Sequence, residues 1–246
     1  MQTPSTDRET VRELLLLLAG LAVVALAAGA SRMFWKGWQM APFADILRWR
    51  EAFSMFLFAP ALAVLFWFIV RCTGRGRMHP AIKVVSLLAV YFLACGMGMH
   101  DPANRMCGSY PAGAMQPAVR QSLVYFDDVL GHQVFWTGFV LATWALGVQQ
   151  VLTPLDGRLP RFAGISLGAV DLALLFVFFT NLAFEFPNTK QDCRVILAAA
   201  ALPTAVWLFR MRGRGLLRMP MLLVILPVCW GSVALTWGYW LFKGIP

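Results

Sequence analysis

Five ionisable residues lie close to the ends of long apolar segments in this chain of 246 residues. They are two histidines and three carboxylates: His100, Asp127, Asp128, His132 and Glu185. Ionisable groups at or inside a bilayer are costly, and they commonly mark a functional site. Imidazoles and carboxylates are also the groups that bind divalent metals and transfer protons. These residues therefore predict either a metal site or a site that handles protons.

The spacing within this group assigns different roles to its members. Asp128 and His132 are four residues apart, which places both on one face of a helix as potential ligands of one ion. Asp127 points about 100° away from Asp128 in an α-helix. We therefore expect Asp127 to orient an imidazole or to serve as a base rather than to bind a metal directly.

The other two members lie at the ends of neighbouring apolar segments. His100 closes one segment, and Pro102 is expected to end that helix just beyond it. Glu185 lies four residues after Asn181 near the end of another segment. The ends of consecutive helices are often neighbours, so His100, Asp128, His132 and Glu185 can lie close together.

A converged group of this kind predicts a divalent metal, Zn²⁺, Mn²⁺ or Fe²⁺, with His100, Asp128, His132 and Glu185 as ligands. Glu185 is also a candidate general base, and Asp127 its catalytic partner. The main alternative is a hydrogen-bonded polar cluster without metal; a haem held by His100 and His132, or groups that do not meet, are further alternatives.

The composition indicates that these residues belong to a membrane protein. Hydrophobic residues make up 59% of the chain and charged residues only 13%, about half the charged fraction typical of a soluble domain. The net charge of +9 comes from Lys and Arg in short loops, as membrane insertion requires, so the charge does not indicate a nucleic-acid partner.

Hydropathy predicts an all-α integral membrane protein of about seven transmembrane helices, forming one domain over residues 1–246. The predicted spans are 12–30, 53–71, 82–100, 123–152, 162–186, 194–209 and 219–242. Segment 31–52 mixes Trp with Lys and Arg, which predicts an amphipathic helix lying in the outer membrane interface.

Counting charges predicts the orientation. Twelve Lys and Arg residues flank one side of the predicted spans, mostly in short loops, and nine flank the other. The denser side is expected to be cytoplasmic. This places the N-terminus inside and the C-terminus outside a bacterial plasma membrane, with the five ionisable residues at the extracytoplasmic face.

Three further features follow from local sequence. The Pro and Gly content of segment 101–122 predicts an outer loop. Cys107 and Cys193 would then lie in two outer loops, where they either form a disulfide or remain separate thiols. Asp171 lies in the middle of a span and is expected to face the bundle interior.

Three functions remain open at this stage. The first is a metal-dependent membrane enzyme, a hydrolase or an oxidoreductase, that acts on a lipid-like substrate at the extracytoplasmic face. The second is a non-catalytic subunit or assembly factor that binds membrane-protein partners, with the polar cluster serving helix packing. The third is a proton-coupled carrier, which the absence of a detectable repeat disfavours.

The sequence matches no family by its motifs. Membrane metallohydrolases of the alkaline ceramidase and progestin-receptor-like type share seven spans and a histidine–aspartate site. They carry a paired H-x-x-x-H on the last span, however, and residues 219–242 contain no histidine.

Overall fold

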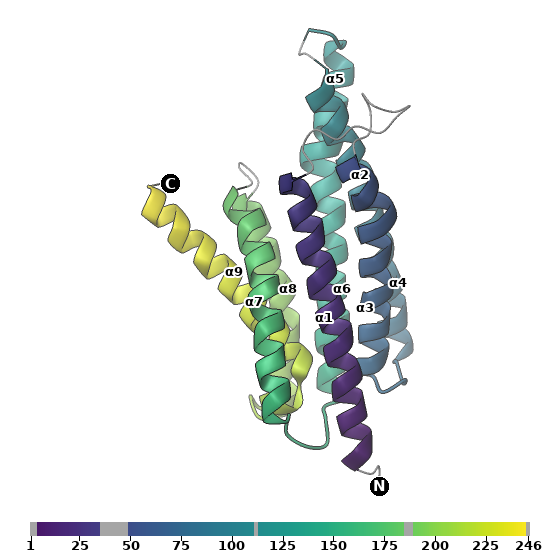
Figure 1. The fold of residues 1–246 in the computed structure, drawn as a ribbon, viewed down its shortest axis with the longest axis vertical. Helices are drawn as coiled ribbons and strands as arrows, with labels where there is room; N and C mark the ends of the chain where they lie inside the picture. Colours follow the sequence, from purple (N-terminus) through teal and green to yellow (C-terminus); the bar gives the residue numbers. More distant parts are fainter. Residues whose placement is uncertain (1–3, 35–48, 111–112, 185–188, 245–246) are drawn as a thin grey trace.

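The computed structural model describes residues 4–34, 49–110, 113–184 and 189–244. In these ranges the chain is helical and contains no strand. Seven helical segments are long and apolar enough to cross a membrane, and Figure 1 shows them side by side. The prediction of an all-α membrane bundle is therefore confirmed.

Twelve helical elements make up the described part of the chain. They are α1 (Pro4–Phe34), α2 (Trp49–Phe53), the π-helical turn η1 (Ser54–Phe58), α3 (Ala59–Thr73), α4 (Pro80–Ser109), α5 (Pro117–Val124), the π-helical turn η2 (Tyr125–Gly131), α6 (His132–Leu152), α7 (Arg161–Phe184), α8 (Thr189–Met211), the 3₁₀ turn η3 (Leu216–Arg218) and α9 (Pro220–Lys243). α2, η1 and α3 together form one span, and so do α5, η2 and α6.

Helix α6 holds the two halves of the bundle together. It packs against α4 on one side and α8 on another, and it also touches α3 and α9. One core cluster joins α3, α4 and α6 through residues such as Phe66, Ala89 and Ala145. A larger cluster joins α1, α7, α8 and α9, with Leu18, Leu167 and Ile196 among its buried members.

The backbones of α4 and α6 approach closely at two glycines. A Cβ atom at Gly96 would lie 2.5 Å from the main-chain nitrogen of Phe135, and one at Gly138 would lie 2.5 Å from that of Leu93. No side chain fits at either distance. The small residues therefore set the spacing of these two helices, as is common in membranes.

Polar side chains of α6 bond to two neighbouring segments at the end of the bundle that holds the N-terminus, an end that Figure 1 shows. Gln149, which is 2% exposed, donates to the carbonyl oxygen of Arg77 at 3.3 Å. Gln150 accepts a hydrogen bond from the main-chain N–H of Met221 at 3.2 Å. These contacts tie the end of α6 to the α3–α4 turn and to the start of α9.

The structure corrects two predictions about segment 101–122. Pro102 does not end the helix, because α4 continues to Ser109. Because proline has no N–H, the main-chain carbonyl of Gly98, four residues earlier, loses its helical hydrogen-bond donor. Gly98 is exposed and its surroundings are open. The expected outer loop is also largely helical, since α5 begins at Pro117 and leaves only a short connection.

The structure tests three other predictions, on the spans, the interfacial helix and the two outer cysteines. Five of the seven predicted spans lie inside observed helical segments, and the sixth is longer than expected, extending over Thr189–Met211. The fifth, 162–186, extends past Phe184 into residues outside the described ranges, and the seventh, 219–242, begins one residue before α9. The expected interfacial helix falls mostly on residues 35–48, which lie outside the described ranges. Cys107 and Cys193 are free thiols in the structure, so the disulfide alternative is not realised there.

Candidate functional site

The candidate site lies where α4 meets the π-helical turn η2 and the start of α6. His100 and Asp127 form a close pair, with 2.6 Å between the imidazole Nδ1 and a carboxylate oxygen. The same Nδ1 lies 3.3 Å from the main-chain carbonyl oxygen of Asp127. The imidazole therefore faces both acceptors of one residue.

Asp127 is held from a second direction. The side-chain amide of Asn104 donates to its other carboxylate oxygen at 3.1 Å. His100 and Asn104 are four residues apart, so the continuation of α4 past Pro102 is what brings both groups to Asp127. The Asp127 side chain is only 8% exposed, which means that folding removes this carboxylate from water.

His132 completes the group. Its ring lies 4.8 Å from that of His100, centroid to centroid, and the two ring planes are almost perpendicular at 83°. Gly131 permits this approach, because a Cβ atom there would lie 3.1 Å from the Cβ of His100. We call Asp127, His100 and His132 the histidine–aspartate cluster.

The π-helical turn explains why Asp127 and not Asp128 joins this cluster. An α-helix would align residues four apart, whereas the i→i+5 bonding of η2 brings residues five apart closer to one face. Asp127 precedes His132 by five residues, and both contact His100. Asp128 is exposed. The supporting role predicted for Asp127 thus becomes the central one.

The predicted metal ligands do not form a recognisable site among the described residues. No group of three or more His, Cys, Asp or Glu side chains is arranged there to hold an ion. His100 directs Nδ1 at Asp127, and Asp128 is an exposed residue of the turn. Glu185, the fourth predicted ligand, lies outside the described residues, so the complete set of four stays a prediction.

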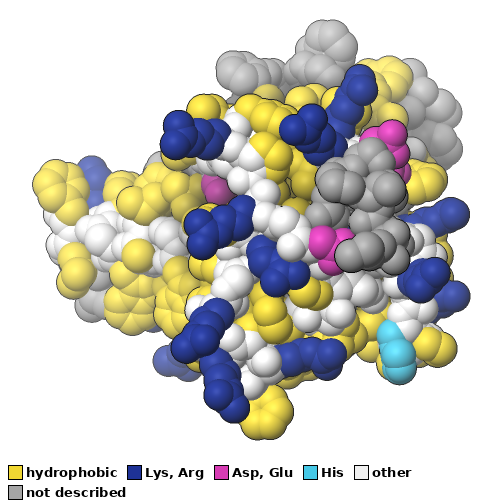
Figure 2. Space-filling model, turned by 90° about the horizontal axis from the view of Figure 1, so that it is seen from below, with side chains coloured by type: hydrophobic (Ala, Val, Ile, Leu, Met, Phe, Trp, Pro, Cys, Tyr) yellow, Lys and Arg dark blue, Asp and Glu magenta, His cyan; other side chains and the backbone are white. Residues whose placement is uncertain are grey.

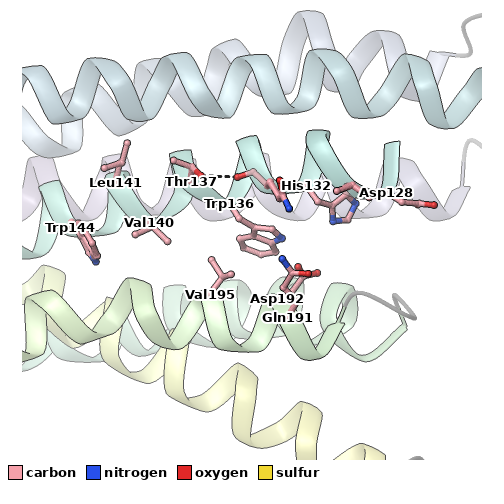
Figure 3. Close-up of a pocket in the computed structure, with 12 residues that line it drawn as sticks. Asp128, His132, Trp136, Thr137, Val140, Leu141, Trp144, Gln191, Asp192 and Val195 are labelled. Atoms are coloured by element: carbon pink, nitrogen blue, oxygen red, sulfur yellow. Dashed lines mark hydrogen bonds between the residues drawn. The ribbon is translucent and has the colours of Figure 1, made fainter. Parts of the chain in front are cut away.

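A groove of about 560 Å³ opens beside the cluster, between α6 and α8. Figure 3 shows the side chains of α6 on one wall and those of α8 on the other. Its volume falls in the range of small-molecule sites. The lining residues are Asp128, Val129, His132, Gln133, Trp136, Thr137, Val140, Leu141, Trp144, Gln191, Asp192 and Val195.

The groove is polar at one end and apolar at the other. Asp128, His132 and Asp192 lie near the start of the two helices, and Val140, Leu141 and Trp144 lie deeper (Figure 3). His132 is the residue common to both features, since it contacts His100 and also lines the groove. The groove and the histidine–aspartate cluster therefore form one continuous site.

The chain was compared with known proteins at the level of families, sequences and folds. No protein-family model, curated protein or solved structure matches the chain. Its function has to be inferred from its own geometry.

Sequence reasoning missed the groove, although part of it is visible in the sequence. Asp128, His132, Trp136, Val140 and Trp144 recur at every fourth position, as expected for a single helical face. The opposite wall, from Gln191 to Val195, could not be found in this way. It depends on the contact of α6 with α8, which are far apart in the chain.

Two other polar features lie away from this site. Gly164-Ile165-Ser166-Leu167-Gly168 matches the G-x-S-x-G pattern, but it lies inside α7, where Ser166 donates to the carbonyl of Phe162 at 3.1 Å. A nucleophilic serine of that pattern requires a turn between a strand and a helix. Asp171 is partly buried in the middle of α7 and has one carboxylate oxygen without a hydrogen-bond partner.

Proposed function

We propose that this membrane protein binds an amphiphile with a single apolar chain in the groove between α6 and α8. We further propose that His132, supported by His100 and Asp127, performs acid–base chemistry on the headgroup. The observation that supports this most strongly is the double position of His132, in the groove and against His100.

The depth of the groove fits such a ligand. His132 lies 20 residues from Leu152, the end of α6, a length of about 30 Å and close to the thickness of the hydrocarbon core. His132 would then lie at headgroup level. Trp144 lies 12 residues deeper, about 18 Å along the axis, so the groove extends through about one leaflet.

The lining suits the two parts of an amphiphile. Val140, Leu141 and Trp144 offer apolar contact to a hydrocarbon chain at the depth where lipid tails lie. Gln133, Thr137 and Gln191 offer hydrogen-bonding groups at the level of a headgroup. A soluble polar substrate would gain nothing from the apolar half of this groove.

The chemistry follows from the residues at the polar end. The His132 imidazole accepts a proton from a water molecule while the water oxygen attacks an ester or amide carbonyl of the amphiphile. The imidazolium then returns that proton to the leaving alcohol or amine. The Asp127 carboxylate holds the imidazole of His100, and His100 lies against the ring of His132. His100 and Asp127 act as positioning residues.

This proposal keeps the substrate class predicted from the sequence and reassigns the residues. Asp127 remains a member of the site, and Glu185 and Asp128 are not needed for the step described. The predicted Zn²⁺, Mn²⁺ or Fe²⁺ is tested separately, by treating the purified protein with EDTA and then restoring each ion.

The test is a search for turnover. Purified protein in detergent micelles is incubated with a total lipid extract, and mass spectrometry identifies lipids that are consumed together with their products. We expect His132→Gln to slow product formation by about 100-fold or more, because general acid–base catalysis contributes on that scale. His79→Gln removes an exposed histidine at the other end of the bundle and should leave the rate unchanged.

Two results would contradict the proposal. One is an equal rate for His132→Gln and the wild type. The other is no consumption of any lipid by a folded wild-type protein, which would favour the alternative of a non-catalytic subunit.

A further inference from the structure

Nearly all the net positive charge of the chain is concentrated at one end of the bundle. The N-terminal segment and the loops at residues 71–83, 153–161 and 210–218 carry twelve Lys and Arg residues and only four Asp and Glu residues. Figure 2 views the molecule from this end and shows Lys and Arg side chains spread across it. We call this surface the basic end.

Two turns of the same construction form much of the basic end. The α3–α4 turn contains Arg75-Gly76-Arg77, and the α8–α9 turn contains Arg212-Gly213-Arg214. In both, the first arginine and the glycine have left-handed backbone conformations, with φ of 51° and 75° in one turn and 50° and 69° in the other. Left-handed arginine is uncommon, so its repetition in two turns is a distinctive feature.

The α6–α7 loop lies between these turns and is held by a cation from each side. Arg75 forms an ion pair with Asp156 at 2.9 Å and also donates to the carbonyl of Pro154. Arg218 donates to the carbonyl of Leu155 at 2.6 Å. These two arginines therefore have structural roles, and Asp156, the acidic residue of this loop, is already in an ion pair.

The remaining arginines of the turns and the loop face solvent. Arg77, Arg158, Arg161, Arg210, Arg212 and Arg214 are all exposed. Charge-directed insertion accounts for the presence of cations in these loops. Insertion does not require that folding bring three loops together and leave their arginines exposed on one surface at the membrane boundary.

We propose that the basic end binds the headgroups of anionic phospholipids in the adjoining leaflet. The guanidinium group donates two parallel hydrogen bonds to a phosphate oxygen pair, which makes arginine well suited to this ligand. Clusters of basic residues next to a membrane attract anionic lipids with a strength that grows with each cation. This site is separate from the groove and does not depend on the function proposed for it.

The experiment measures lipid binding by native mass spectrometry in dodecyl maltoside micelles. Dioleoyl-phosphatidylglycerol is the anionic probe, and dioleoyl-phosphatidylcholine, with the same chains, is the neutral probe. We expect the wild-type protein to retain the anionic lipid in preference to the neutral one. The double variant Arg212→Gln/Arg214→Gln should bind the anionic lipid more weakly, by about fivefold for each arginine removed.

The matched control removes two exposed cations from the opposite end, Arg194 and Lys243, by the same substitution to glutamine. We expect this control to bind the anionic lipid as the wild type does. The thermal midpoint of each variant in lipid-free micelles reports whether it has folded. Equal retention of the two lipids by the wild type, or equal losses in the two double variants, would overturn the proposal.

Discussion

Asp127→Ala is expected to lower the free energy of unfolding by about 2–3 kcal/mol, and the same substitution at its neighbour Asp128 is expected to have a smaller effect. The Asp127 carboxylate is buried, pairs with His100 at 2.6 Å and accepts a hydrogen bond from Asn104. Its removal leaves the imidazole and the amide without this partner, and the loss of one member of a buried pair is costly. The His100 side chain is 22% exposed, so water offsets part of the loss.

The control for this prediction is the adjacent residue. Asp128 is exposed in the same turn, and Asp128→Ala should lower the free energy of unfolding by at most about 1 kcal/mol, because interactions of exposed carboxylates contribute little. Both variants are unfolded chemically in mixed detergent micelles, and circular dichroism monitors the loss of helix. Equal effects of the two substitutions would show that Asp127 does not have the special position described above.

The second large effect is expected at Gly96. Gly96→Ala would place a methyl group 2.5 Å from the main-chain nitrogen of Phe135 and 2.6 Å from its Cα. Neither atom belongs to a flexible side chain, so α4 and α6 must separate. We expect a loss of about 1–3 kcal/mol, the usual range for overpacking.

Gly98 provides a matched control two residues further along the same helix. No atom lies within 4 Å of the position that a Cβ would occupy there. Gly98→Ala is therefore expected to be neutral or to stabilise the protein by up to about 1 kcal/mol, because alanine favours the helix. Both variants are compared by thermal unfolding in detergent, and a larger loss for Gly98→Ala would refute the packing described for α4 and α6.

Gly96→Ala is also expected to disturb the candidate site. His100 lies one turn beyond Gly96 and meets Asp127 and His132 across the α4–α6 contact. A wider helix spacing should therefore weaken the histidine–aspartate cluster together with the fold. We expect Gly96→Ala to reduce both stability and any turnover, and Gly98→Ala to reduce neither.

The sequence predicted the membrane spans well because hydrophobicity is a local property. Long apolar runs in a bilayer have few alternatives to a helix, since their backbone groups must bond within the segment. The ends of the helices were less predictable. Pro102 is normally a sign of termination, yet α4 continues beyond it and carries Asn104 to Asp127.

The sequence predicted which residues lie near one another in the site, but not which of them are in contact. Residue types alone brought attention to His100, Asp127 and His132, and the structure places these three together. The choice between Asp127 and Asp128 depended on the π-helical turn Tyr125–Gly131, which interrupts the α-helical period used for the prediction. The second wall of the groove depended on the contact between α6 and α8, which no local pattern reveals.

The central claim is that the groove between α6 and α8 holds an apolar chain with its headgroup beside His132. A photoactivatable amphiphile with a diazirine midway along a single alkyl chain tests this claim directly. After illumination and digestion, mass spectrometry locates the labelled residues. We expect labels concentrated on Val140, Leu141 and Val195, and competition by an unlabelled amphiphile with the same chain. Labels spread evenly over lipid-facing residues such as Leu172, Phe176 and Leu235, without competition, would contradict it.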